Sequence, residues 1–321
     1  MKKTFELRQE RNFGAKISGA FEFIKQNFAG LAKPILYIAL PFGLLAGYFF
    51  SEYFSFLFSS GQNLNDPYAG GSSEIFDMLF NQLGLLLSLL AGSILVICVI
   101  FSYLALYDED KDRKISYSMV FGKLKKRFWR FLGFNVVYIL ALIVAFAVLI
   151  VVCVVLPVLL ITQVPVLGII LYILMLGVLV LFVLFFMSIL YILQNTLFFE
   201  NLSVWKTFSR AVSLIKGHFW ETIGLMIVVS FILNILSMVF IIPLYIIIFM
   251  SKMGVELGEA GKVMIIAISL ISSFFSFLTL PLMQIPMSLQ YFNLVEKKDG
   301  TGLIGQIEKI GQARIEQDDD V

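Results

Sequence analysis

Charged residues are scarce in this sequence of 321 residues. Asp, Glu, Lys and Arg make up 14% of it, whereas soluble domains average roughly 25%. The apolar set of A, V, I, L, M, F, W, Y and C reaches 60%, above the roughly 45–50% that soluble domains reach even with glycine counted. A soluble fold of this size would expose too much of that apolar surface to water. The composition therefore excludes a soluble enzyme, a disordered chain and a disulfide scaffold, and indicates an integral membrane protein.

Histidine and cysteine are also rare, with one His and two Cys. His218 has no second histidine with which to build a His-based metal site, and Cys98 and Cys153 lie inside apolar runs, where cysteine behaves as a small hydrophobic residue. No glycine-rich phosphate loop and no close acid–base pair is present. We therefore expect no enzyme activity, no metal and no cofactor. The net charge of +2 gives no reason to expect nucleic acid as a partner.

Long runs without charge define the membrane topology. One run, Phe131–Phe199, is long enough for two helices joined by a turn at Thr162–Pro165. Because these runs lack the polar alternation of barrel strands, they favour helices. The sequence predicts six membrane-spanning helices, at about 32–57, 76–106, 131–158, 166–198, 220–250 and 263–294.

The basic residues predict the orientation of these spans. All of the 24 Lys and Arg residues except Lys252 and Lys262 fall on the same side of the predicted topology. Because basic residues are retained in the cytoplasm, we expect both termini to be cytoplasmic. The expected location is the bacterial inner membrane, with a multi-pass topology.

Three segments place apolar residues at steps of three and four with basic residues between them, which is typical of a helix lying in the membrane plane. They share the motif apolar-Lys-x-x-Phe, which occurs at Ile24–Phe28, Leu124–Phe128 and Ile215–Phe219. This recurrence predicts three repeat units, each an interfacial helix followed by a transmembrane hairpin, at about 13–109, 115–200 and 203–296. A pseudo-threefold axis along the membrane normal would relate them.

The expected fold is thus an all-α integral membrane protein with six transmembrane helices and three amphipathic interfacial helices on the cytoplasmic face. We interpret 13–295 as a single six-helix membrane domain, with a cytoplasmic N-terminus at 1–12 and a cytoplasmic tail at 296–321.

The first candidate site is a basic surface on the cytoplasmic side. Its residues are Lys123, Lys125, Lys126, Arg127, Arg130, Lys206, Arg210 and Lys216. A basic residue near an anionic leaflet gains about 1 kcal/mol. We therefore expect the lipid bilayer and its anionic headgroups to be the partners of this surface, although anchoring of the topology alone would produce the same pattern.

The second candidate site is neutral. The centres of the predicted spans contain no ionisable residue, which argues against a proton or ion relay. Amide side chains remain, and Asn234 and Gln284 are the deepest of them. These two define a candidate intramembrane polar site for a lipid or small solute. The alternative is that the amides form hydrogen bonds between helices.

The segment Glu200–Trp220 combines an acidic helix exit, a helix of aromatic and small residues, and Ile-Lys-Gly-His-Phe-Trp at the opening of the next span. It resembles the membrane domain attached to some glycerophosphoryl diester phosphodiesterases, and related stand-alone six-helix bacterial families of uncharacterised function. The resemblance extends, at the level of pattern, over 13–295. It implies a membrane module without hydrolase activity, because the phosphodiesterase of that family is a separate soluble domain. Similar stand-alone proteins suggest a partner role beside a membrane-linked ATPase system.

The function that we expect is therefore a non-enzymatic scaffold or accessory component of a membrane complex or lipid-related process, with protein partners in that complex. The alternative is a permease for a lipid-like or uncharged small solute.

Overall fold

The computed structural model describes residues 5–62, 72–111, 114–255 and 258–300. Over these ranges the regular structure is helical, with no strand. Six helical stretches are long and apolar enough to cross a membrane, as the sequence predicts: Phe13–Phe56, Phe76–Glu109, Tyr117–Ile161, Pro165–Phe199, Phe219–Lys252 and Gly258–Asp299. The protein is therefore an all-helical, multi-pass membrane protein. The expected tail at 296–321 lies largely outside the described residues.

The long uncharged run contributes to two membrane-length helical stretches that are separated near Val164, which confirms the predicted turn. Helix α4 (Leu156–Gln163) ends and α5 (Pro165–Phe199) begins around Val164, whose φ of −136° and ψ of 83° are not helical. Pro165 is the cause, because a proline disfavours the helical conformation of the residue before it. The turn is tight, since a Cβ on Gly168 would lie 2.5 Å from the backbone nitrogen of Ile161.

A π-helical segment, η1 (Val151–Val155), separates α3 (Tyr117–Ile150) from α4. Pro157 lies two residues after the end of η1 and has no N–H to donate to the carbonyl of Cys153. Proteins commonly accommodate such a missing hydrogen bond by a local π-type widening or a kink. The sequence analysis placed this region inside a regular span and did not anticipate η1.

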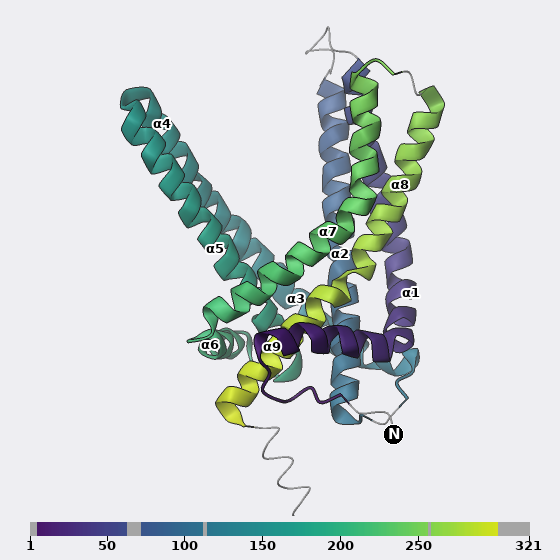
Figure 1. Cartoon of the computed structure of the whole chain (residues 1–321), viewed down its shortest axis with the longest axis vertical. Helices are drawn as coiled ribbons and strands as arrows, with labels where there is room; N and C mark the ends of the chain where they lie inside the picture. Colours follow the sequence, from purple (N-terminus) through teal and green to yellow (C-terminus); the bar gives the residue numbers. More distant parts are fainter. Residues whose placement is uncertain (1–4, 63–71, 112–113, 256–257, 301–321) are drawn as a thin grey trace, which may run out of the picture. The chain divides into compact units, whose positions relative to one another are not determined.

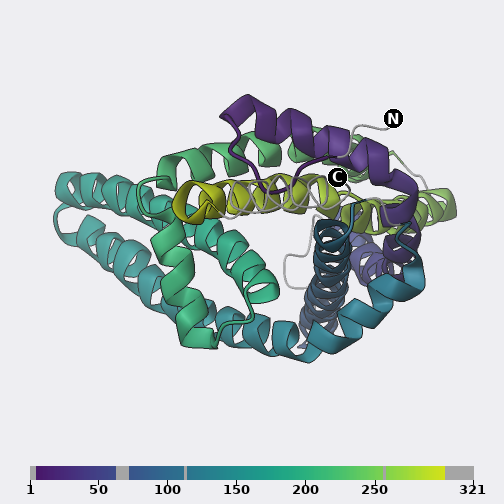
Figure 2. The ribbon, with the colours of Figure 1, turned by 90° about the horizontal axis from the view of Figure 1, so that it is seen from below.

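Two of the three amphipathic segments are not separate helices. Helix α1 (Phe13–Gln62) and helix α3 each run without interruption from the amphipathic segment into the predicted span. Figures 1 and 2 show that α1 changes direction along its length, and Pro34 and Pro41 inside it each remove a helical hydrogen bond. The start points predicted near 32 and 131 therefore lie in the interior of helices.

The third amphipathic segment is a separate helix, α6 (Val204–Ile215), followed by α7 (Phe219–Lys252). Gly217 divides them with a φ of +85°, a left-handed conformation that glycine adopts without steric cost. The corresponding positions of the other two segments carry Gln26 and Lys126. Glycine at this one position explains why only the third segment breaks.

The chain divides into two compact units, which are described separately. Unit 2 comprises 18–124 and 227–285, and it holds most of α1, α2 (Ser72–Glu109), most of α7 and α8 (Gly258–Leu278). Glycines let these helices pack closely. A Cβ on Gly47 of α1 would lie 2.7 Å from the Cα of Leu270 of α8, and one on Gly92 of α2 would lie 2.5 Å from the ring of Phe277.

Unit 1 comprises 1–17, 125–226 and 286–321. Its described part holds the hairpin of α3 and α5, helix α6, the start of α7 and the end of α9 (Leu280–Asp299). The two arms of the hairpin lie side by side in both ribbon views (Figures 1 and 2). Phe146 packs edge-on against Phe182 across the hairpin, with ring centroids 6.0 Å apart. Most other side chains of the hairpin face outward, as expected of helices surrounded by acyl chains.

Candidate membrane-surface site

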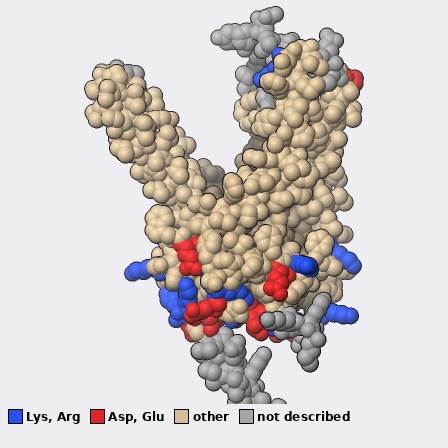
Figure 3. All heavy atoms as spheres, in the orientation of Figure 1, with Lys and Arg blue, Asp and Glu red and all other residues tan. Residues whose placement is uncertain are grey.

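Charged side chains of unit 1 gather around α6 and the end of α9, whereas the α3–α5 hairpin beyond Arg130 carries none (Figure 3). This separation is what a membrane-spanning hairpin with a polar base requires, because charges are costly in the hydrocarbon core. The base therefore contains the candidate surface site.

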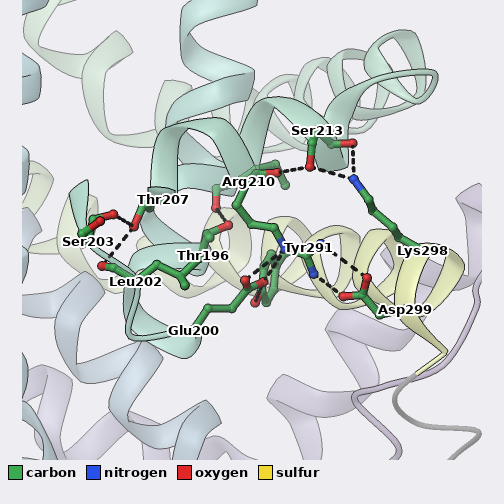
Figure 4. Close-up of polar contacts among 11 residues, drawn as sticks. Thr196, Glu200, Leu202, Ser203, Thr207, Arg210, Ser213, Tyr291, Lys298 and Asp299 are labelled. Carbon is green, nitrogen blue, oxygen red and sulfur yellow. Dashed lines mark hydrogen bonds and ion pairs between the residues drawn. The ribbon is translucent and has the colours of Figure 1, made fainter. Parts of the chain in front are cut away.

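Arg210 of α6 is the centre of an ion-pair network shown in Figure 4. Its Nε lies 3.0 Å from Oε2 of Glu200, at the end of α5, and its Nη2 pairs with Asp299, at the end of α9. The hydroxyl of Tyr291 donates to Oε1 of Glu200 at 2.9 Å. Nearby, Nζ of Lys298 donates to Oγ of Ser213 at 2.7 Å. The network ties α5, α6 and α9 together.

These contacts change the interpretation of Arg210 as a headgroup ligand. Burial by itself lowers the pKa of Arg210, but the hydrogen bond that Arg210 donates to Asp299 and the attraction of Glu200 outweigh it, so the pKa lies above its ordinary value. Arg210 is therefore a cation already paired with two carboxylates of the protein. Lys206 and Lys216, by contrast, are exposed, with no ion pair among the described residues.

A second ion pair, which the sequence analysis missed, lies between the start of α1 and the start of α7. The side chain of Lys16 is 0% exposed and its Nζ pairs with Oε1 of Glu221. Glu221 also lies 3.2 Å from Nδ1 of His218 and 3.6 Å from Nζ of Lys297. The sequence analysis assigned no partner to Lys16. The only sign of a partner for Lys16 in the sequence is Glu221, an acidic residue at the start of a span.

Helix α6 has two apolar faces. Thr207, Ala211 and Leu214 are buried against the protein. Another stripe is exposed, and it consists of Val204, Trp205, Phe208 and Val212. An exposed apolar stripe of this kind is typical of a surface that contacts a membrane or another protein.

We expect Phe208→Asp combined with Val212→Asp to detach α6 from the membrane surface, because both carboxylates would have to enter the acyl region. Amide hydrogen exchange over 203–217 in lipid nanodiscs should accelerate by at least an order of magnitude. Lys206→Gln with Lys216→Gln changes the net charge by the same amount and should leave exchange nearly unchanged. Fast exchange in the unmodified protein would contradict a membrane-bound α6.

The basic residues of α3 fall into two environments. Lys123 pairs with Glu109, and Lys125 and Lys126 are exposed. Arg127 lies with its guanidinium carbon 5.2 Å from the ring centroid of Phe198. Arg130 donates to the carbonyl of Leu202 and, at 3.4 Å, to Oδ1 of Asn201.

Arg127 and Arg130 also line a small surface pocket together with Phe131, Leu197 and Phe198. All five residues belong to unit 1. Its three apolar lining residues are at most 3% exposed, so the pocket is too small to receive a lipid headgroup.

The structure does not bring Asn234 and Gln284 into contact. Asn234 is exposed on α7 and donates to the carbonyl of Ser230 in its own helix, whereas Gln284 is buried. Hydrogen bonds between helices form elsewhere, as the alternative interpretation expected. Nε2 of Gln194 donates to Oδ1 of Asn135 at 2.8 Å, and Nε2 of Gln290 donates to Oγ1 of Thr222 at 2.8 Å. These pairs could not be predicted from the sequence, because the two residues of each pair lie 59 and 68 positions apart.

Among the described residues, no group of three or more His, Cys, Asp or Glu side chains is arranged to hold a metal ion. The arrangement at the base of unit 1 is one of ion pairs, exposed cations and exposed aromatic residues. No protein family model, no curated protein and no solved structure matches this chain.

Proposed function

We propose that this protein is a non-enzymatic integral membrane component of the bacterial inner membrane that serves as a scaffold or accessory subunit of a membrane complex or lipid-related process. The observation that carries the proposal is α6: it is fixed to α5 and α9 by Arg210, yet it presents an exposed apolar stripe. A fixed helix of this kind provides a rigid surface at the membrane boundary. The resemblance of Glu200–Trp220 to membrane modules that accompany other proteins supports a partner role.

The proposed topology places both termini and α6 in the cytoplasm. Its support is the distribution of basic residues, since Lys252 and Lys262 alone fall on the opposite side. The proposed arrangement also includes a threefold repeat of an amphipathic segment followed by a hairpin, for which the shared apolar-Lys-x-x-Phe motif is the support.

We expect cysteine labelling to reveal this topology. In a chain carrying Cys98→Ala and Cys153→Ala, Val164→Cys should react with a membrane-impermeant maleimide in intact cells. Ser203→Cys should react only after the membrane is permeabilised. Labelling of Val164→Cys from the cytoplasmic side alone would contradict the proposed orientation.

Affinity purification of the full chain in native lipid tests the scaffold proposal. We expect one dominant protein complex to co-purify, and Lys206→Gln should not remove it. Recovery of the chain alone, under conditions in which a known complex of the same membrane stays intact, would contradict a scaffold.

A permease for a lipid-like or uncharged solute is the second candidate, and buried polar atoms favour it. In unit 1, Oδ1 of Asn195, Oε1 of Gln290 and Nδ2 of Asn293 are buried and have no hydrogen-bond partner among the described residues. Such atoms are normally satisfied by water or a ligand. Transport of a fluorescent lipid analogue by the chain in liposomes, lost in Gln290→Leu, would favour the permease over the scaffold.

A further inference from the structure

We propose that His218 controls a pH-sensitive latch at the start of α7, in which protonation of His218 releases Lys297 from Glu221 and frees the end of α9 from α7. These residues and Lys16, the fourth member of the latch, all belong to unit 1. His218 is the one histidine of the chain, and histidine is the side chain that ordinarily changes charge between pH 5 and 8.

The carboxylate of Glu221 is shared by groups from three parts of the chain. Its Oε1 pairs with Nζ of Lys16, near the start of α1. Its Oε2 lies 3.2 Å from Nδ1 of His218, at the corner between α6 and α7, and 3.6 Å from Nζ of Lys297, in the last turn of α9. An imidazole and an ammonium group therefore compete for one oxygen.

The contact with Glu221 determines which ring nitrogen of His218 takes up the proton. An ionised carboxylate can only accept hydrogen bonds, so the neutral imidazole donates from Nδ1 and keeps Nε2 as its basic nitrogen. The side chain is 35% exposed and can exchange protons with water. Protonation at Nε2 thus adds a positive charge without removing the Nδ1–H that contacts Oε2.

Protonation places three cations around the one carboxylate of Glu221. Arg11 adds to the repulsion, because its charge also acts on Lys16. Lys16 cannot withdraw, since its side chain is 0% exposed and its ammonium group would be left buried and unpaired. Lys297 is 30% exposed and makes the longest of the three contacts. Lys297 is therefore the group that moves into water.

Release of Lys297 changes the attachment of the end of α9. Two further contacts bind this end to α6: Lys298 donates to Ser213, and Asp299 pairs with Arg210. Neither contact involves a histidine. After protonation of His218 the end of α9 therefore stays attached to α6 but no longer to the start of α7.

Thermal unfolding of the full chain in detergent at pH 7.5 and pH 5.5 tests the latch. At pH 7.5, Lys297→Gln should lower the unfolding temperature by about 2 °C, as expected for the loss of a partly exposed ion pair. At pH 5.5 the same substitution should have no effect or raise the unfolding temperature, because it relieves repulsion from protonated His218. In a His218→Asn background Lys297→Gln should lower the unfolding temperature equally at both pH values, since asparagine donates a hydrogen bond but takes up no charge.

Lys262→Gln is the matched control, because Lys262 pairs with Glu259 at 3.0 Å and no histidine takes part. Its effect should be the same at the two pH values. Equal effects of Lys297→Gln at pH 7.5 and pH 5.5 would overturn the proposal. So would the absence of any effect at pH 7.5, or a pH dependence that persists in the His218→Asn background.

Amide hydrogen exchange provides a second readout. After correction for the intrinsic effect of pH, the amides of residues 294–299 should exchange faster at pH 5.5 than at pH 7.5 in the original chain, but not in His218→Asn. Equal protection of these amides at both pH values would equally overturn the latch. The latch operates within one chain, so its failure would leave the proposed scaffold role untouched.

Discussion

Replacing Glu221 by Gln should be among the most destabilising single substitutions in unit 1. The side chain of Lys16 is 0% exposed and that of Glu221 is 26% exposed, so the substitution leaves an ammonium group buried beside a neutral amide. Breaking a buried pair in this way costs about 3–5 kcal/mol, and the partial exposure of Glu221 favours the lower end. Thermal unfolding of the full chain in detergent should show the loss.

An exposed pair of the same type provides the control. Lys262 and Glu259 are 56% and 86% exposed and lie 3.0 Å apart on α8. Glu259→Gln should change the stability by no more than about 1 kcal/mol. Lys16→Met combined with Glu221→Leu should recover much of the stability lost in Glu221→Gln, because no buried unpaired charge remains. Equal unfolding temperatures of Glu221→Gln and Glu259→Gln would contradict the prediction that Glu221 stabilises the buried ammonium group of Lys16.

Gly47→Ala should separate α1 from α8 in unit 2. The added Cβ would lie 2.7 Å from the Cα of Leu270 and 2.8 Å from its Cδ2. A flexible side chain could move away, but a backbone atom moves only if the helix moves. Overpacking of this kind costs about 1–3 kcal/mol, and the loss should appear as a lower unfolding temperature in detergent.

Gly177→Ala on α5 is the matched substitution, since nothing lies within 4 Å of the position where its Cβ would be. Alanine is favoured over glycine in a helix by about 1 kcal/mol in water. Gly177→Ala should therefore be neutral or slightly stabilising. A loss of stability equal to that of Gly47→Ala would indicate a general intolerance of alanine and not a close approach of α1 and α8.

The apolar runs of the sequence were sufficient to predict the six spans, because crossing a bilayer imposes a length and a composition that few other structures share. The hairpin turn was predictable for a local reason, since Pro165 acts on the residue before it. The π-helical segment before Pro157 depends on how a missing hydrogen bond is accommodated, and the charge-free pattern of the run carries no sign of it.

The candidate site could be predicted only in part. The alternation of apolar and basic residues identified α6 as amphipathic, and its exposed stripe agrees with that pattern. The pattern could not show which cations are already paired. Arg210 and Lys206 look equivalent in sequence, yet the first meets carboxylates from two other helices. Lys16 and Glu221 are 205 positions apart, so only the fold brings them together.

Gly217 suggests how little sequence change separates the two forms of the amphipathic segment. Where Gln26 or Lys126 occupies the matching position, the segment and the following span form one uninterrupted helix. Where glycine occupies it, the same motif becomes a separate helix with its own inclination. Substitution of this one residue is therefore expected to decide whether the amphipathic segment continues into the span or ends as a separate helix.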